Sequence, residues 1–341
     1  MLLQREIFCG VCREKSASYY YFFNGLGCIM KNKTDIAIRK NYFEDTIVIL
    51  GDFDIAGHNM NYVLRMSCYG SRMNGRNVRV YFALLDDTKR EYSEVSYDYD
   101  SDTVIIDDNR LLVRTDKFEL RDSDEGLKVF INYETIIFDF VIKRSNDKID
   151  IKKFGKSNEG GKVETYTYPE CYAAGHATVL DNYMDIAGNA FYIRHSQSFE
   201  NSLAKRLFGK KSSIEEKSNY MFGFFKMSDD RKLMLGSYNS EKESTDQLGV
   251  LRYGDLQERD IEPLKKTMME YINAEDKETR ILTLNINSFT NKFAIKCKTR
   301  MNSCENLSPE DPNFRMFDKF VRCAGNYEGD KVTGYGYLVM F

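Results

Sequence analysis

The stretch Arg280–Met301, "RILTLNINSFTNKFAIKCKTRM", alternates apolar and polar side chains on both sides of a short polar turn. In Arg280–Phe289, leucine and isoleucine take every second position before the turn, and threonine and asparagine stand between them. In Asn291–Met301, phenylalanine, isoleucine and cysteine alternate mainly with lysines. Successive side chains of a strand point to opposite faces, so a half-buried antiparallel strand shows this period of two. The stretch therefore predicts a hairpin, with "SFTNK" as its compact connection.

The same period of two recurs along most of the chain. "NVRVYFALL" (Asn77–Leu85) shows it in the first half, and further candidate strands are separated by turns roughly every 8–12 residues. The sequence holds 23 Tyr and 23 Phe, whose rings pack well on a half-buried pleated surface. About eighteen such strands point to a sandwich or barrel architecture, so we predict an all-β protein.

Two stretches depart from the strand pattern. Glu262–Ile272, "EPLKKTMMEYI", has helical spacing, and Pro263 suits a first helical turn, so we predict one short helix there. The polar stretch Lys143–Lys162 is the best domain boundary and divides the chain into residues 1–155 and 156–341. Each half then has roughly 8–10 strands, enough to close an antiparallel barrel that holds one small ligand. Closure also removes exposed sheet edges.

The charge balance argues against a nucleic-acid-binding protein. The formal net charge is −3 and the isoelectric point is about 5.9, whereas nucleic-acid-binding proteins usually present a basic face. The densest basic segment, Ala204–Lys211, is typical of a solvated loop. No apolar run reaches the roughly 20 residues of a membrane-spanning helix, and no segment resembles a secretory signal. We therefore expect no nucleic-acid partner, no stable membrane insertion and a cytoplasmic location.

The cysteine pattern predicts neither disulfides nor a metal site. Eight cysteines are scattered through a chain too large to need disulfides, so reduced thiols are expected. Cys9 and Cys12 form a lone CxxC without a second pair or histidines at zinc-finger spacing. The glycine stretches "AGNA" and "GYG" do not open a helix, so they do not indicate a phosphate-binding loop. We expect no metal and no cofactor.

The second half of the chain carries a family resemblance. In Ala173–Phe199, "AAGHATVLDNYMDIAGNAFYIRHSQSF", small residues and glycine are followed by a short turn and an aromatic strand that ends near His195. Two further segments follow, "YMFGFFKMSDDRKLMLGSY" (Tyr220–Tyr238) and "VTGYGYLVMF" (Val332–Phe341). In this order the three segments resemble the carotenoid 1,2-hydratase (CrtC) and AttH-like family, which includes the lipocalin-like Diels–Alderases.

The resemblance implies two lipocalin-like β-barrel domains in tandem, with a pocket at or between them for an apolar, polyene or isoprenoid-like ligand. Three positions depart from the family motif, because Arg194 replaces an acid, Gln197 a tryptophan and Ser198 a glycine. Alkene protonation in the hydratases needs a carboxylic acid, so the motif alone does not support hydratase chemistry. A cyclase that orients and polarises a polyene depends less on such an acid.

His195 is the main candidate catalytic residue, with Gln197 beside it. An imidazole can donate a hydrogen bond or transfer a proton near neutral pH, although the same ring can also tie a strand end to its neighbour. Arg194 alternates with His195, so the two side chains should point to opposite faces, and a surface or ion-paired role suits Arg194. His176 is expected to approach His195 across the hairpin. His58 is expected in an exposed loop.

The predicted ligand-binding set combines charged and aromatic side chains of the second half. Alternating aromatic residues of this kind form a core more often than a ligand pocket, where they supply apolar walls and phenol donors. The set consists of His176, Tyr192, Arg194, Tyr220, Phe222, Phe224, Tyr335 and Tyr337.

Three hypotheses of function follow, one of them an interaction scaffold whose barrels are filled by their own aromatic side chains. In the first, the chain is a cyclase, isomerase or hydro-lyase that acts on an apolar polyene or isoprenoid-like molecule without a metal or redox cofactor. In the second, it is a non-catalytic lipocalin-like carrier of a lipid or other apolar ligand. A buried titratable group facing the ligand would favour the enzyme. The substrate and the oligomeric state stay open.

Overall fold

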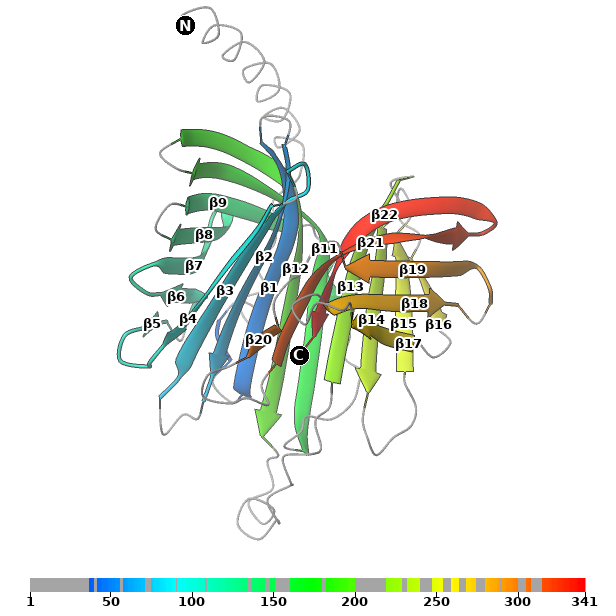
Figure 1. Cartoon of the computed structure of the whole chain (residues 1–341). Coiled ribbons are helices and arrows are strands. Elements are labelled where there is room, and N and C mark those ends of the chain that lie inside the picture. Colours follow the sequence, from blue (N-terminus) through cyan, green and yellow to red (C-terminus); the bar gives the residue numbers. More distant parts are fainter. Residues whose placement is uncertain are drawn as a thin grey trace, which may run out of the picture. The chain divides into compact units, whose positions relative to one another are not determined.

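The computed structural model consists of strands that form two antiparallel sheets (Figure 1). It describes residues 37–39, 42–55, 58–70, 75–89, 91–107, 109–133, 136–144, 148–150, 160–179, 182–199, 219–228, 232–239, 247–253, 259–263, 268–273, 280–288, 290–299, 305–307 and 315–340. All of these residues belong to one compact unit, residues 34–341. No helix among them is long and apolar enough to cross a bilayer.

The first sheet has the strand order β4-β3-β2-β1-β12-β11-β9-β8-β7-β6-β5, with β10 paired to β11. Its strands are β1 (Tyr42–Ile55), β2 (His58–Tyr69), β3 (Asn77–Asp86), β4 (Glu91–Tyr99), β5 (Ile105–Ile106), β6 (Leu112–Arg114), β7 (Phe118–Ser123), β8 (Gly126–Tyr133), β9 (Ile136–Arg144), β10 (Ile149–Asp150), β11 (Gly160–Val179) and β12 (Asn182–Phe199). The long β11–β12 hairpin returns to the middle of this sheet, so that β12 pairs with β1 and β11 pairs with β9.

The second sheet has the order β16-β15-β14-β13-β22-β21-β19-β18-β17, with β20 paired to β21. Its strands are β13 (Asn219–Met227), β14 (Lys232–Asn239), β15 (Gln247–Tyr253), β16 (Arg259–Pro263), β17 (Met268–Asn273), β18 (Arg280–Asn287), β19 (Phe293–Thr299), β20 (Glu305–Leu307), β21 (Arg315–Tyr327) and β22 (Asp330–Met340). The hairpin predicted at Arg280–Met301 is confirmed as β18 and β19, which pair Ile286 with Ile295.

Alternation along the strands divides the buried side chains among three clusters. The largest cluster lies on one face of the first sheet and includes Ile49, Tyr62 and Phe138. The opposite face of that sheet packs against the second sheet, where Val48 belongs to the same cluster as Phe224. The third cluster occupies the other face of the second sheet. We call the middle cluster, which contains residues of both sheets, the shared core.

The sequence analysis predicted one short helix and one domain boundary, and the structure bears on both. The helix predicted at Glu262–Ile272 is wrong: among the described residues, Arg259–Pro263 pairs with β15 and Met268–Asn273 pairs with β18. An apolar run this short fits both periods, and strand pairing prevails over local propensity. The expected domain boundary after residue 155 falls within the first sheet, whose last strand ends at Phe199. No disulfide joins the cysteines that the structure describes.

Candidate functional site

The strand β12 presents two different polar groups on its two faces. His195 lies opposite Thr46 of β1 and Thr165 of β11, on the face that carries the shared core. Arg194 points to the other face, as the alternation of a regular strand requires. Both side chains are fully buried. The end of β12 therefore carries two separate polar clusters.

His195 is held by hydrogen bonds on both ring nitrogens. Its Nδ1 lies 2.8 Å from Thr165 Oγ1, and its Nε2 lies 3.2 Å from Gln197 Nε2. Burial, with the nearby Arg65 cation as a second cause, lowers the pKa of His195 from 6.5 to about 3, so the ring is neutral at pH 7. The Gln197 amide donates to Nε2, and the ring proton therefore lies on Nδ1 and is donated to Thr165.

Gln197 joins this histidine to a carboxyl group that the sequence analysis did not single out. Gln197 Nε2 lies 3.5 Å from Glu44 Oε2, and Thr46 donates to Glu44 Oε1 over 3.0 Å. Gln197 Oε1 is buried and has no hydrogen-bond partner among the described residues. A buried acceptor of this kind carries a free-energy cost unless a donor reaches it. The site thus offers one open acceptor beside a carboxyl group.

Glu44 is a half-buried acid that retains its proton more readily than an exposed one. Burial raises its pKa above the ordinary 4.5, although the Thr46 hydrogen bond and the Arg65 charge act in the opposite direction. Glu44 pairs with Gln197 across β1 and β12. In the sequence, Glu44 belongs to the polar triplet "EDT", which directly precedes the apolar run of residues 47–50. Only the strand register shows that Glu44 lies beside Gln197.

The cluster on the other face is a buried ion pair. Arg194 binds Asp45 through two nitrogens, with Nε 2.9 Å from Oδ1 and Nη2 2.5 Å from Oδ2, and Ser196 Oγ donates to Oδ1 over 2.8 Å. Burial alone would raise the pKa of Asp45, but the Arg194 charge and hydrogen bonds lower it below 3.8. Arg194 is thereby committed to Asp45, in agreement with the ion-paired role considered for it.

The buried aromatic residues of the predicted ligand-binding set are divided between the shared core and the core of the first sheet. Phe222 packs near His195, with ring centroids 6.3 Å apart, and Phe224 and Tyr337 belong to the same shared core. Tyr192 faces the first sheet's own core on the opposite side. The side chain of Tyr220 lies outside the described residues. The geometry brings together His195, Gln197 and Phe222 of the predicted set.

Both other histidines lie elsewhere. His176 pairs with Asp185 at 2.8 Å and stacks on Tyr183, whereas His195 lies opposite Thr165, so the expected approach of the two histidines is wrong. His58 begins β2 and contacts Asp86 at 3.2 Å, so it is a strand residue rather than a loop residue. No cluster of three or more potential metal ligands occurs among the described residues.

Known proteins share the fold of this chain without a detectable match in sequence. No family model matches it, and no curated protein matches its sequence. A solved protein classed as AttH from Nitrosomonas europaea superimposes with a TM-score of 0.69 at 11% identity, over 92% of this chain and 97% of that one. Kievitone hydratase from Nectria haematococca superimposes with a TM-score of 0.64 at 14% identity, over 93% of this chain and 94% of that one. The chain has the fold of these two proteins.

The shared fold confirms the predicted architecture. The AttH and kievitone hydratase structures match this chain across both sheets, so the all-β, lipocalin-like organisation in two parts is correct. The resemblance based on Ala173–Phe341 is confirmed at the level of the fold. At 11% and 14% identity the likeness does not extend to activity. The chemistry therefore has to be argued from the side chains around Glu44.

Proposed function

We propose that the chain is an enzyme that adds to, or cyclises, a double bond of an apolar polyene or isoprenoid-like molecule, with Glu44 as the proton donor. The observation that carries the proposal is the cross-strand contact between Glu44 and Gln197. It places a carboxylic acid opposite Gln197, within the motif in which the resembling family has an acid and this chain has Arg194. The acid stands on the neighbouring strand instead of on β12.

The proposed reaction takes its proton donor from this site and its nucleophile from water or from the substrate. The Glu44 carboxylic acid gives its proton to one alkene carbon, and a cation forms at the other. Water captures the cation and returns a proton to the Glu44 carboxylate, or a second double bond of the substrate captures it and the proton lost on ring closure goes back to Glu44. A raised pKa suits a general acid, because the group keeps its proton to a higher pH than an exposed glutamate does.

The neighbouring side chains support these steps in different ways. Gln197 Oε1, without a partner among the described residues, can accept a hydrogen bond from the water. His195 is fully buried, so we assign it as a positioning residue that fixes the Gln197 amide. The Phe222 ring beside it can shield developing positive charge. Arg65, whose charge acts on Glu44, stabilises the carboxylate after proton transfer.

A carrier of an apolar ligand is the alternative. A carrier has no use for a half-buried acid with a raised pKa, because burying an ionisable group costs stability without contributing to apolar binding. Kievitone hydratase is named as an enzyme, and its likeness to this chain supports the first hypothesis without deciding it. The two functions differ in whether the bound molecule changes.

The test begins with the ligand. The full chain is purified from its native cells, the apolar compound that co-purifies is identified by mass spectrometry, and candidate unsaturated precursors are incubated with the protein in deuterium oxide. Alkene protonation places one deuterium on carbon in the product. We expect Glu44→Gln to slow this incorporation about 10²–10⁴-fold. Glu119→Gln, which changes a half-buried glutamate of β7, is the matched control and should keep full activity.

The outcomes separate the alternatives. Deuterium incorporation that Glu44→Gln leaves unchanged would overturn the role of Glu44. A bound compound that remains unaltered, with no precursor converted, would show a carrier. His195→Asn should lower turnover less than Glu44→Gln does, because a positioning residue acts only through Gln197.

A further inference from the structure

A row of basic side chains crosses the second sheet on the face that carries the shared core. Strand pairing places Lys226 of β13 opposite Tyr335 of β22, Tyr335 opposite Arg322 of β21, and Arg322 opposite Lys298 of β19. Lys296 lies two residues from Lys298 on the same face. We call Lys226, Arg322, Lys298 and Lys296 the basic row. It lies where the second sheet extends beyond the apolar part of the shared core.

The arrangement of the basic row costs stability by itself. Arg322 and Lys298 are directly opposite each other, and like charges in that position repel. Arg322 reaches one carboxylate, Asp87, at 3.3 Å, but both groups are partly exposed to water. Burial raises the pKa of Asp52, and the charge of Lys226, which lies near this acid, acts in the opposite direction. Among the described residues, no carboxylate lies within ion-pair distance of Lys296 or Lys298.

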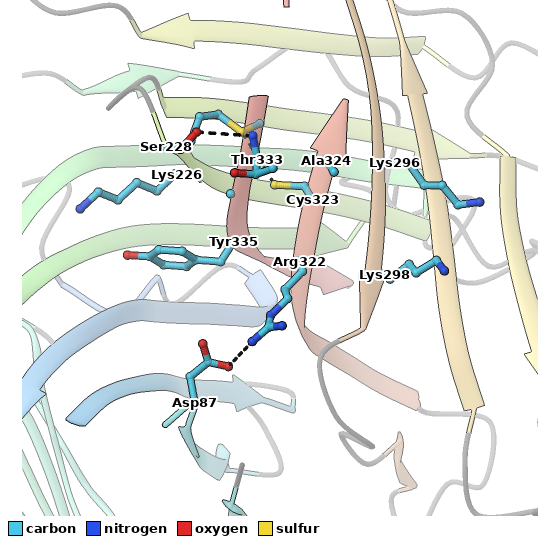
Figure 2. A pocket seen from close by; sticks show the side chains of 12 residues that line it. Asp87, Lys226, Ser228, Lys296, Lys298, Arg322, Cys323, Ala324, Thr333 and Tyr335 are labelled. Atoms are coloured by element: carbon cyan, nitrogen blue, oxygen red, sulfur yellow. Dashed lines mark hydrogen bonds and ion pairs between the residues drawn. The ribbon is translucent and has the colours of Figure 1, made fainter. Parts of the chain in front are cut away.

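The basic row lines a groove. A pocket of about 730 Å³ is bounded by these four cations and by the hydroxyl-bearing side chains of Ser228, Thr333 and Tyr335, and Asp87 is the one carboxylate among its described lining residues. Figure 2 shows Arg322 and Tyr335 in the middle, Lys296 and Lys298 on one side and Lys226 on the other. The two lysine side chains extend away from Arg322, the direction that repulsion favours, and their long flexible stems can turn towards an anion.

This groove is separate from the site around Glu44. Lys226 and Tyr335 line the groove and interact with Asp52, so the groove lies near that end of β1. Glu44 lies near the other end of β1. Eight residues of extended strand separate the two acids, which corresponds to ~27 Å. A small ligand in the groove would therefore not contact Glu44, and its binding can be tested independently of the proposed acid chemistry.

We propose that the groove binds a small phosphorylated compound through a phosphate or diphosphate group. Lys296 and Lys298 have no carboxylate partner among the described residues, and two such cations favour a multiply charged anion over a single carboxylate. Phosphate oxygens accept bonds from the Arg322 fork and from lysine ammonium groups, and the hydroxyls of Ser228 and Thr333 add neutral donors. Binding would remove the repulsion between Arg322 and Lys298.

The test is titration calorimetry of the full chain with inorganic pyrophosphate at low ionic strength. We expect saturable one-to-one binding that is tighter than the binding of inorganic phosphate and weakens as salt is added. Lys298→Gln should weaken it about fivefold, and Lys298→Gln combined with Arg322→Gln should weaken it at least ~25-fold. Lys128→Gln, which removes the same charge from β8 of the first sheet, is the matched control and should leave affinity unchanged.

Thermal unfolding with and without pyrophosphate gives a second readout. Pyrophosphate should raise the Tm of the wild type but not that of the double variant, and without ligand the variants should unfold no earlier than the wild type, because repulsion has been relieved. Absence of saturable binding would overturn the proposal, as would equal weakening by Lys128→Gln. Binding to phosphatidylglycerol vesicles or to an oligonucleotide, without binding to pyrophosphate, would show a macromolecular partner instead and would also overturn it.

Discussion

Glu44 combines a candidate catalytic role with an energetic cost that can be measured. Burial raises its pKa, so the folded chain binds this proton more tightly than the unfolded chain does. Below pH 4.5 both states are protonated and no cost arises. As pH rises, the unfolded chain loses the proton first, so the free energy of unfolding falls, and the whole penalty is present above the folded-state pKa.

We therefore expect Glu44→Gln to increase the free energy of unfolding at pH 7 while it slows the proposed reaction about 10²–10⁴-fold. The gain should disappear below about pH 4.5, the unfolded pKa, where the wild-type side chain is also neutral. Urea denaturation of both proteins at several pH values measures the difference. A Glu44→Gln variant that is less stable than the wild type at pH 7 would contradict the assignment of a raised pKa. Lost function combined with gained stability is expected where a functional group, here a buried carboxyl group, lowers the stability of the fold.

His195 should give stability the opposite pH dependence. Its folded-state pKa is about 3 against 6.5 in the unfolded chain, so between these values only the unfolded chain takes up the proton. The free energy of unfolding should fall with acidification through this window, by up to about 1.4 kcal/mol per pH unit. His195→Gln should make the decline shallower. Replacing the exposed His176 by Gln is the control, and an equal flattening there would refute the prediction.

The strands illustrate what could be predicted from sequence and what could not. Alternation within Arg280–Met301 predicted both β18 and β19, because the period of two is a local property of the chain. The pattern in Glu262–Ile272 fits a helix and a strand almost equally, and only pairing with β15 and β18 decided between them. The contact of Glu44 with Gln197 depends on the register of strands about 150 residues apart, which no local pattern encodes.

The close approach of the neighbouring strands β1 and β12 depends on one glycine of the "AGNA" motif. A Cβ atom on Gly188 would lie 1.7 Å from the carbonyl oxygen of Asp52, far inside contact distance. We expect Gly188→Ala to cost about 1–3 kcal/mol or more, because the two strands must separate. Chemical denaturation measures this cost. Ala187→Ser changes the half-buried neighbouring position and should have a much smaller effect, and equal losses would contradict the role of close backbone approach.

The shared core makes the two sheets one energetic unit. Phe224 of β13 packs on Phe191 of β12, with ring centroids 5.2 Å apart. Tyr337 of β22 donates its hydroxyl to the carbonyl oxygen of Gly51, at 2.5 Å, and to Asn61 Oδ1, at 3.1 Å. Because these contacts join strands that are distant in sequence, weakening them should affect both sheets together.

Tyr337→Phe tests this coupling with the smallest available change. Removing the hydroxyl leaves buried acceptors on Gly51 and Asn61 without this donor, which should cost about 1–3 kcal/mol. Hydrogen exchange measured by mass spectrometry should then speed up in β1 and β2 of the first sheet as well as in β22. Tyr183→Phe, at a side chain that is 66% exposed, should change neither stability nor exchange. Faster exchange confined to β22 would mean that the first sheet holds its structure without the second, and the shared core would then be a contact surface between independently stable parts.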